Sequence, residues 1–588
     1  MNKIIFLLGY ICSLLVYPHF AFSQNSGFVS EYEEYVFNQD KNKNLWDKVK
    51  NDWNNSWIST DIRLEKNIPP KTSVIKTWKI TAWRGENINL QAVIWSKKDM
   101  GDIHASIEKL SSENGSIIPS ENIQVNVVRY VITDELNKDK KGTCGYRPDK
   151  TVFDSLLVAD VIDIKSHENI YANEVRPFWV KIKIPSDINP GAYKGILSFN
   201  HSGLSSLQLE INVQQHILPE PQDWKFHLDL WQNPFSIARY HNVPLWSSEH
   251  MELMRPIIKI LSGAGQKIIT ASIMHKPWNG QTYDHFESMI MRIKKIDGNW
   301  QYDYAVFDKW VEFMMSMGIN QQINCFTMVP WDLSFQYFDQ ASDQLKAIRA
   351  EPGTQEFVDY WEPFLIDFAS HLKEKGWFDK TTIAMDERPM KSMQKVIELI
   401  KKVDPKYKIS LAGNYHSEIE PDLYDYCIAI AQSFPDDVLV KRKAENKKST
   451  VYTCCAEPYP NTFTFSPTAE STWFGWYVAN KKYDGYLRWA YNSWNEEPLV
   501  DTRFISWGAG DCFFVYPGGR SSIRMEKLIE GIQDYEKIQI LKQKFEKEEN
   551  QSKLKKIEQI LAPFEVDKLK NIPASEMINN ARKQLNKL

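Results

Sequence analysis

The 588-residue chain has few cysteines and lacks the usual spacing of metal ligands. Its seven cysteines are too sparse for a disulfide framework, and neither a Cys-x-x-Cys pair nor a His-x-x-x-His spacing occurs. Several of the cysteines fall within apolar runs, where cysteine is usually a small buried hydrophobic residue. We therefore expect no structural zinc site, no other bound metal and no cofactor.

The chain also lacks a strong positive charge and, beyond its N-terminus, any long apolar run. The net charge of -4 gives no basic surface of the kind that nucleic-acid binding needs. Lys3, the apolar run from Ile4 to Val16 and Ala21-Phe22-Ser23 form a signal-peptide pattern over residues 1–23. That run is too short for a stable membrane span. We expect an exported protein, periplasmic or secreted, with neither membrane insertion nor a nucleic-acid partner.

Two regions with different periodicity meet near residue 220. From Thr72 to Val213, short alternating strands and turns follow one another without helical patterns, as in an antiparallel β-sandwich. Beyond the stiff Leu218-Pro219-Glu220-Pro221 linker, strand-like and helix-like stretches alternate, which indicates a (β/α)8 barrel. We assign residues 24–217 to the sandwich, 218–545 to the barrel and 546–588 to a lysine-rich, solvated helical tail.

Nine stretches beyond the linker have the composition of buried strands, one more than a (β/α)8 barrel needs. One of the nine is therefore expected to be a rim strand or a misassignment. The stretches are Phe226–Leu230, Lys267–Ile273, Gln322–Thr327, Thr381–Asp386, Lys408–Gly413, Cys427–Ala431, Val451–Cys454, Gly485–Tyr491 and Cys512–Tyr516.

Polar and aromatic side chains follow most of these strands, at the edge where (β/α) barrels carry their active sites. Carboxylates, amides, a histidine and indoles at so many strand ends indicate a sugar pocket, since flat rings suit sugar faces. The candidate substrate-binding residues are Asn233, His275, Trp331, Asn414, Tyr415, Trp489, Tyr491 and Trp494. Each of them could instead be a rim residue whose polar atoms are satisfied within the protein.

Two adjacent carboxylates, Asp386 and Glu387, end the apolar run 381–385, which reads as a buried strand. Side-chain alternation places Asp386 on the same face as Thr382 and Ala384, which we expect to point into the barrel. Glu387 then lies just beyond the strand, where its longer side chain can reach across the cleft. The alternative is a helix cap or a loop salt bridge, and the residues alone leave these two interpretations balanced.

Seven segments of the chain form a recognisable set: Asp229-Leu230-Trp231-Gln232-Asn233-Pro234, Met385-Asp386-Glu387, Asp484-Gly485-Tyr486-Leu487-Arg488-Trp489, Gly508-Ala509-Gly510-Asp511, Val515-Tyr516-Pro517-Gly518, Ser522-Ile523-Arg524 and Glu530-Gly531-Ile532-Gln533-Asp534-Tyr535-Glu536. Through these segments the chain resembles glycoside hydrolase family 123, the N-acetyl-β-galactosaminidases, over nearly the whole mature chain. The segments from Asp484 onward are shared by a broader group of proteins, whereas the Asp-Glu pair after a barrel strand indicates the hydrolase.

The resemblance implies a retaining, substrate-assisted mechanism that removes terminal β-linked N-acetylgalactosamine from a glycan. In that mechanism the 2-acetamido oxygen of the substrate attacks C1, so the protein supplies no nucleophile. Glu387 would be the acid/base, and Asp386 would orient the acetamido N–H and stabilise the developing charge. Ionised Asp386 would also raise the pKa of Glu387. Tyr415 or Tyr491 could donate a hydrogen bond to the acetamido carbonyl.

Two other interpretations remain open. A retaining glycosidase with a covalent carboxylate nucleophile would use Glu457 or Glu470 and would act on substrates without a 2-acetamido group. A catalytically silent protein would bind glycans without cleaving them. The preference for the galacto over the gluco configuration rests on the resemblance, because it depends on one axial hydroxyl whose partner the residues do not identify.

Overall fold

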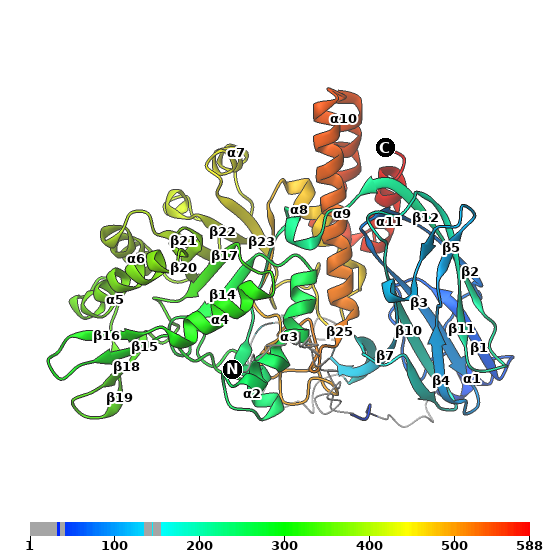
Figure 1. The fold of residues 1–588 in the computed structure, drawn as a ribbon, viewed down its shortest axis with the longest axis horizontal. Coiled ribbons are helices and arrows are strands. Elements are labelled where there is room, and N and C mark those ends of the chain that lie inside the picture. The colour runs from blue at the N-terminus through cyan, green and yellow to red at the C-terminus, as the bar shows by residue number, and fades with distance from the viewer. Residues whose placement is uncertain (1–31, 36–41, 135–143, 145–154) are drawn as a thin grey trace, which may run out of the picture.

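The computed structural model describes residues 32–35, 42–134, 144 and 155–588, and the predicted signal peptide lies outside these residues. A β-sandwich and a (β/α) barrel lie side by side, with the long helix α9 (Ile523–Lys547) between them (Figure 1). Within the described residues, none of the helices combines the length and the apolar character that a membrane crossing requires.

The N-terminal unit consists of two sheets that enclose an apolar core, which confirms the predicted sandwich. The sheets are ordered β1-β3-β10-β7-β8-β25 and β2-β12-β11-β4-β9, with β5 and β6 attached to β11. All of these pairs are antiparallel except β2 with β12. Inward-facing residues of both sheets, such as Val180 and Ile211, fill the core. The bounds are α1 (Lys43–Trp46), β1 (Trp53–Ile58), β2 (Thr77–Arg84), β3 (Asn87–Ser96), β4 (Gly101–Ser106), β5 (Leu110–Ser112), β6 (Ile117–Ile118), β7 (Ile123–Thr133), β8 (Leu156–Ile162), β9 (His167–Ile170), β10 (Glu174–Lys183), β11 (Gly191–Phe199), β12 (Leu207–Ile217) and β25 (Ser521–Ser522).

The C-terminal unit is a near-closed barrel of eight parallel strands that follow one another in chain order, as predicted. The ninth predicted strand, residues 512–516, is not a strand, because Phe513 and Tyr516 form isolated bridges there. The barrel strands are β13 (His227–Leu230), β14 (Ile268–Ser272), β17 (Gln322–Phe326), β20 (Thr381–Asp386), β21 (Lys408–Gly413), β22 (Asp425–Ala429), β23 (Lys448–Tyr452) and β24 (Gly485–Arg488). The helices that surround them are α2 (Pro234–His241), α3 (Ser248–Gly263), α4 (Ala305–Ser316), α5 (Gln355–Glu374), α6 (Met390–Val403), α7 (Asp436–Ala444), α8 (Ala469–Lys481) and α9.

Two glutamine side chains complete the barrel where β13 and β14 do not form a continuous ladder. Gln266 accepts a hydrogen bond from the backbone N–H of Leu230 at 3.0 Å and donates to the carbonyl of Ile268 at 2.8 Å. Gln232 accepts from the backbone N–H of Thr270 at 2.9 Å. The side chains thus replace missing backbone hydrogen bonds, which buried peptide groups require.

A four-stranded sheet, ordered β16-β15-β18-β19, is inserted in the connections that follow β14 and β17. We did not predict these strands, because most of their side chains are exposed or half-buried and so lack the apolar runs that mark the barrel strands. The connection from β17 to β18 carries Trp331. The bounds are β15 (Met291–Lys294), β16 (Trp300–Asp303), β18 (Ser334–Asp339) and β19 (Gln344–Arg349).

Helix α9 joins the two units. The short strand β25 just before it pairs with β8 of the sandwich, so one chain segment belongs to both units. On its barrel side α9 crosses α8 closely: a Cβ at Gly531 would lie 2.4 Å from the carbonyl oxygen of Thr472, so glycine is required there. Ion pairs connect this segment with the sandwich at Arg520–Asp163, Arg524–Asp160, Lys527–Asp61 and Lys537–Glu86.

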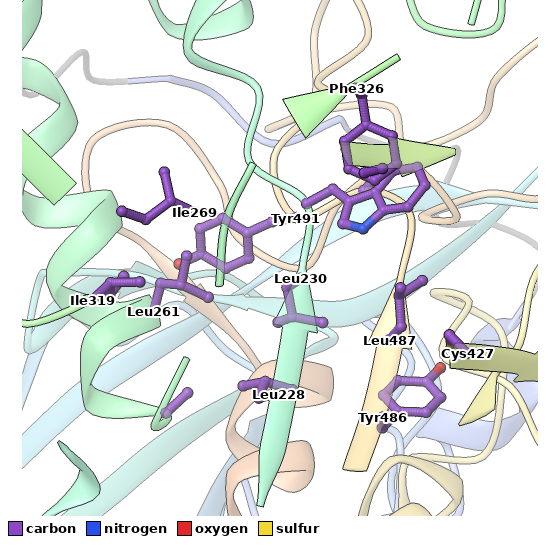
Figure 2. Close-up of a cluster of buried hydrophobic side chains, with 14 of the residues drawn as sticks. Leu228, Leu230, Leu261, Ile269, Ile319, Phe326, Cys427, Tyr486, Leu487 and Tyr491 are labelled. Atoms are coloured by element: carbon purple, nitrogen blue, oxygen red, sulfur yellow. The ribbon is translucent and has the colours of Figure 1, made fainter. Parts of the chain in front are cut away.

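The barrel core extends to the surrounding helices. Figure 2 shows Leu228 and Leu230 of β13 among buried side chains of the neighbouring elements, including Leu261 of α3 and Ile269 of β14. Tyr491, which follows β24, lies in the same cluster. Its ring is therefore part of the apolar packing around the barrel.

The C-terminal segment forms α10 (Gln551–Leu561) and α11 (Ala574–Leu585), and it is not simply solvated as we expected. Phe564 stacks on Trp476 of α8, with ring centroids 5.0 Å apart, and Ile578 is buried. Arg582 forms an ion pair with Asp534 of α9 at 2.7 Å. These contacts make the segment a further layer of the barrel unit.

The described cysteines comprise three buried thiols, the half-buried thiol of Cys454 and one disulfide. Cys325, Cys427 and Cys512 are free and buried, as expected for small hydrophobic residues. Cys144 and Cys455 form a disulfide that we did not expect, between the residues that follow β7 and the loop after β23. These two cysteines are 311 positions apart in the sequence, so no local pattern indicates that they pair.

Candidate active site

Asp386 is the last residue of β20, and it shares the inward face of that strand. The Thr382 hydroxyl, on the same face, donates to Asn324 Oδ1 at 2.6 Å and lies 2.9 Å from Ser410 Oγ. Asn324 and Ser410 belong to the two neighbouring barrel strands, so this face points into the barrel. The alternation that we predicted for this strand is confirmed.

The Asp386 carboxylate has one oxygen in use and one without a partner. Trp331 Nε1 donates to Oδ2 at 2.7 Å, whereas Oδ1 is buried and accepts no hydrogen bond from any described residue. Burial raises the pKa of Asp386 from 3.8 to about 6; the Trp331 hydrogen bond and the Arg388 charge oppose this shift, and Glu387 adds to it. A buried acceptor without a partner is costly, so Oδ1 favours a ligand that donates a hydrogen bond.

Glu387 lies one residue beyond β20, and the end of β21 holds it in place. The backbone N–H of Asn414 donates to Glu387 Oε2 at 3.1 Å, and Asn414 Nδ2 donates to Oε1 at 2.7 Å. His416 Nε2 lies 3.5 Å from Oε1, and 36% of the Glu387 side chain remains exposed. A Cβ at Gly413 would lie 2.8 Å from Glu387 Cβ, so this close approach requires glycine. Glu387 is therefore oriented and still accessible to a substrate.

Tyr452 is a further residue of the barrel mouth that the sequence analysis missed. It is the last residue of β23, and its side chain is half-buried. Burial raises its pKa, and the nearby charges of Glu457 and Glu387 add to this effect, so the hydroxyl stays protonated and can donate. The predicted strand ended at Cys454 instead of Tyr452, which obscured the position of Tyr452 at the strand end.

Three predicted substrate-binding residues are fully buried and have structural roles. Asn233 caps α2 by accepting two backbone N–H groups of its first turn. The Tyr491 hydroxyl donates to the carbonyl of Ile257 at 2.8 Å, and Trp494 Nε1 donates to the carbonyl of Val515 at 2.7 Å. Because their polar groups are used within the protein, we do not retain these three as substrate-binding residues.

Three other candidates are half-buried at the ends of barrel strands. His275 Nδ1 lies 2.7 Å from Glu287 Oε2. The ring of Trp489 makes an edge contact with Trp507, with centroids 5.6 Å apart. Tyr415 packs beside the rings of Tyr426 and Phe434, at 6.0 and 5.6 Å. Together with Trp331 and Asn414, they remain candidates for binding substrate.

The two alternative nucleophiles lie in different surroundings. Glu470, in the first turn of α8, is 6% exposed and accepts from the backbone N–H of Asn461 at 2.7 Å. Burial raises its pKa to about 8, so at neutral pH it is mostly a neutral acid and a poor nucleophile. Glu457 accepts from the backbone N–H of Cys454 at 2.8 Å, in the loop after β23. Of the two, Glu457 is the remaining candidate.

The described part of the chain offers one group of three residues that could hold a metal ion, and this group lies in the sandwich. It consists of Asp102, His104 and His167. The acids of the barrel mouth do not belong to it.

The comparison with known families decides the class of the protein. Residues 231–541 match the family described as glycoside hydrolase 123, catalytic domain, and residues 57–201 match the glycoside hydrolase 123 N-terminal domain. The chain belongs to glycoside hydrolase family 123. The protein is therefore a glycoside hydrolase, with a glycan as its class of substrate.

A solved structure agrees with this assignment. A study of glycolipid glycan hydrolysis by a family 123 glycoside hydrolase from Clostridium perfringens gives a structure with 27% sequence identity and a TM-score of 0.81. The match covers 91% of this chain and 99% of that one. A family 39 glycoside hydrolase from Bacteroides cellulosilyticus WH2 is much less similar, with 10% identity and a TM-score of 0.32 over 74% of this chain and 80% of that one. No curated protein matches the chain.

Proposed function

We propose that this family 123 enzyme is an exported, retaining exo-glycosidase that removes terminal β-linked N-acetylgalactosamine by substrate-assisted catalysis. The observation that carries the proposal is the Asp386 carboxylate. Trp331 fixes its Oδ2, while its buried Oδ1 lacks a partner among the described residues. An acetamido N–H donated to Oδ1 would satisfy this oxygen and hold the acetamido carbonyl oxygen against C1.

In the first step, the acetamido oxygen forms a bond to C1 as the glycosidic C1–O bond breaks. Glu387 protonates the leaving oxygen, and ionised Asp386 stabilises the positive charge of the oxazolinium ion. In the second step Glu387 takes a proton from water, which adds to C1 and reopens the ring with overall retention. Asn414 keeps the Glu387 carboxyl in place. The protonated Tyr452 hydroxyl, at the end of β23, would donate to the acetamido carbonyl.

The ionisation of Asp386 suits this role. With a pKa of about 6, roughly nine in ten of these carboxyl groups are ionised at pH 7. The carboxylate is therefore available to stabilise a cation, and its burial strengthens that interaction. Glu387 has the greater access to solvent, which its exchange of protons with water requires.

Three parts of the proposal rest on different support. The glycolipid glycan of the similar Clostridium perfringens enzyme suggests a glycolipid glycan as substrate here. Export rests on the signal-peptide pattern of residues 1–23. The galacto preference rests on the resemblance to the N-acetyl-β-galactosaminidases.

A panel of aryl β-glycosides tests the reaction. We expect turnover of the N-acetylgalactosaminide, less or none of the N-acetylglucosaminide, and none of the galactoside or glucoside, with inhibition by an oxazoline mimic. Glu387→Gln should abolish turnover of substrates with poor leaving groups and spare part of the turnover of activated aryl glycosides, which need less protonation. Equal activity on the plain galactoside would instead favour a covalent nucleophile such as Glu457. Binding without cleavage of any glycoside would contradict the proposal.

A further inference from the structure

Three potential metal ligands meet on the exposed face of the sandwich, at the edge of its second sheet. The antiparallel strands β4 and β9 place His104 directly opposite His167. Asp102 precedes His104 by two residues and therefore projects from the same face of β4. The intervening Ile103 and the following Ala105 are buried in the core. The pleat of β4 thus separates a core face from a face that carries ligands.

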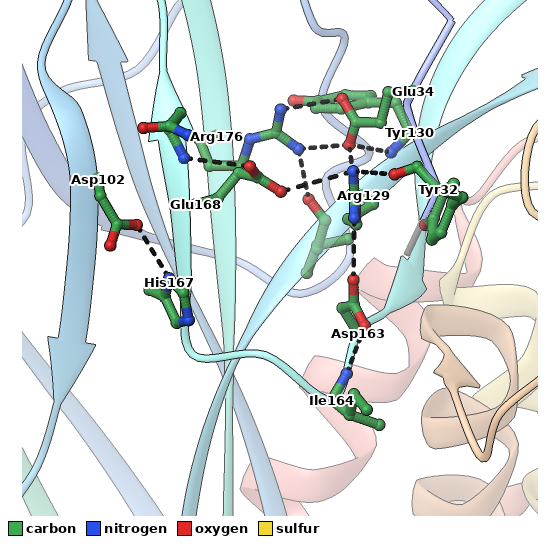
Figure 3. A network of polar contacts seen from close by, with 12 residues as sticks. Tyr32, Glu34, Asp102, Arg129, Tyr130, Asp163, Ile164, His167, Glu168 and Arg176 are labelled. Atoms are coloured by element: carbon green, nitrogen blue, oxygen red, sulfur yellow. Dashed lines mark hydrogen bonds and ion pairs between the residues drawn. The ribbon is translucent and has the colours of Figure 1, made fainter. Parts of the chain in front are cut away.

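The Asp102 carboxylate touches both imidazoles. Its Oδ2 lies 3.0 Å from His104 Nε2, and its Oδ1 lies 2.9 Å from His167 Nδ1, the contact drawn in Figure 3. The two rings stack at 4.4 Å with an interplanar angle of 7°. One ligand atom from each residue lies within 4.8 Å of the other two. Tetrahedral zinc, with bonds of about 2.0–2.2 Å, needs ligand atoms roughly 3.3–3.6 Å apart, which small side-chain rotations provide.

The backbone beneath these ligands is fixed. Asn200 accepts a hydrogen bond from the backbone N–H of His104 at 2.8 Å and donates to the carbonyl of Asp102 at 3.0 Å. The sheet register holds His167 opposite His104 independently of any ion. The ligand positions are therefore preorganised, and an ion would need to order the side-chain torsions alone.

We propose that Asp102, His104 and His167 bind a divalent first-row transition metal ion of the Zn²⁺, Cu²⁺ or Ni²⁺ type. Two imidazole nitrogens and a carboxylate are ligands that these ions favour, whereas Ca²⁺ and Mg²⁺ prefer sites made of oxygen. Three protein ligands leave a position for water. The ion would connect the edge strand β9 to β4, so its effect is on the stability of the sandwich and not on the chemistry of the barrel.

Calorimetric titration of the full-length mature protein with ZnCl₂ at pH 7.5, after treatment with a chelator, tests the site. We expect one equivalent to bind and the midpoint of thermal unfolding to rise. The double variant His104→Gln with His167→Gln should bind none. Asp102→Asn should weaken Zn²⁺ binding by at least roughly 10–100-fold, because losing a residue that only orients a metal ligand already costs that much affinity. CaCl₂ should give no saturable heat.

The matched control is His201→Gln. This histidine lies in the same unit, against the ring of Trp53 and outside the cluster, so the variant should bind Zn²⁺ as the parent does. Electron paramagnetic resonance of the Cu²⁺-loaded parent should show coupling to two imidazole nitrogens, which tests the site without a variant. No saturable Zn²⁺ binding, undiminished binding by the double variant, or Cu²⁺ without nitrogen coupling would each overturn the proposal and leave the cluster as hydrogen-bonded surface residues.

Discussion

Replacing Asp386 by asparagine should stabilise the protein while removing its activity. Burial raises the pKa of this carboxyl from 3.8 to about 6, so the folded state holds the ionised form at a cost. A shift of about two units corresponds to roughly 3 kcal/mol at pH 7, since one unit is about 1.4 kcal/mol. Asparagine has nearly the same shape, keeps an oxygen for the Trp331 indole and does not ionise. Because Asp386 is half-buried, we expect the free energy of unfolding to rise by about 1–3 kcal/mol.

Proton linkage gives the sign and the pH range of this effect. The folded pKa lies above the unfolded one, so the folded protein binds the proton more tightly and loses stability as pH rises from about 4 to 6. The stability advantage of Asp386→Asn should therefore be about 0.5 kcal/mol or less at pH 4 and should reach its plateau above roughly pH 6. Urea unfolding at pH 4, 5, 6 and 7 measures this difference directly.

The same variant should lose at least about 10²-fold in kcat/KM on an aryl N-acetyl-β-galactosaminide, because the oxazolinium charge loses its counterion. Asp343→Asn, which removes an exposed carboxylate in the turn between β18 and β19, is the matched control and should change neither stability nor activity. Equal stability of Asp386→Asn and parent at pH 7, or a gain that is independent of pH, would refute the pKa argument. Full activity would refute the acetamide role.

Other expected outcomes follow from the neighbouring contacts. Trp331→Phe removes a hydrogen bond that lowers the pKa of Asp386, so the acidic limb of the kcat/KM profile should move up from about pH 6 by one to two units; an unmoved limb would argue against this bond. Gly413→Ala places a methyl group 2.8 Å from the Glu387 side chain and should displace its carboxyl group. Steady-state kinetics should show kcat lowered by about tenfold or more, with little change in KM. An unchanged kcat would show that catalysis does not depend on this position of Glu387. Cys455→Ser opens a 311-residue loop, for which chain entropy gives an upper limit of about 5–6 kcal/mol. The thermal unfolding midpoint of the variant should fall to that of the reduced parent protein. If a reductant lowered the midpoint of the variant further, the Cys144–Cys455 disulfide would not be the bond that stabilises the parent.

The architecture and the central acid could be predicted because their signals are local. Alternation along residues 381–386 gives both the strand and the inward direction of Asp386, and the contact of Thr382 with Asn324 confirms that direction. The sandwich and the barrel can likewise be separated, because short strands with a two-residue alternation of side chains give way near residue 220 to strands that alternate with helices. These patterns depend on burial that repeats along the chain, so they need no knowledge of distant contacts.

Other parts of the site depend on contacts that the sequence does not reveal. Asn233, Tyr491 and Trp494 follow barrel strands as substrate-binding residues would, but helix capping and backbone carbonyls use their polar groups. The same residue types serve both purposes, and tertiary packing decides between them. Tyr452 was missed for a different reason, because an error of two residues in the predicted end of a strand hides which side chain stands there.

The contacts between the two units limit how the protein can be divided or recombined. A barrel produced without its partner would lose the carboxylates that pair with Arg520 and Arg524, and it would expose the apolar side chains that now pack against the sandwich residues Trp83, Val131, Val158 and Val161. Each 100 Å² of apolar surface exposed in this way costs about 2.5 kcal/mol, against a net stability of roughly 5–15 kcal/mol for a whole domain. The N-terminal unit is thus no detachable accessory. Chimeras that exchange it must carry matching acids, and truncation libraries should recover no folded catalytic fragment that starts at the linker.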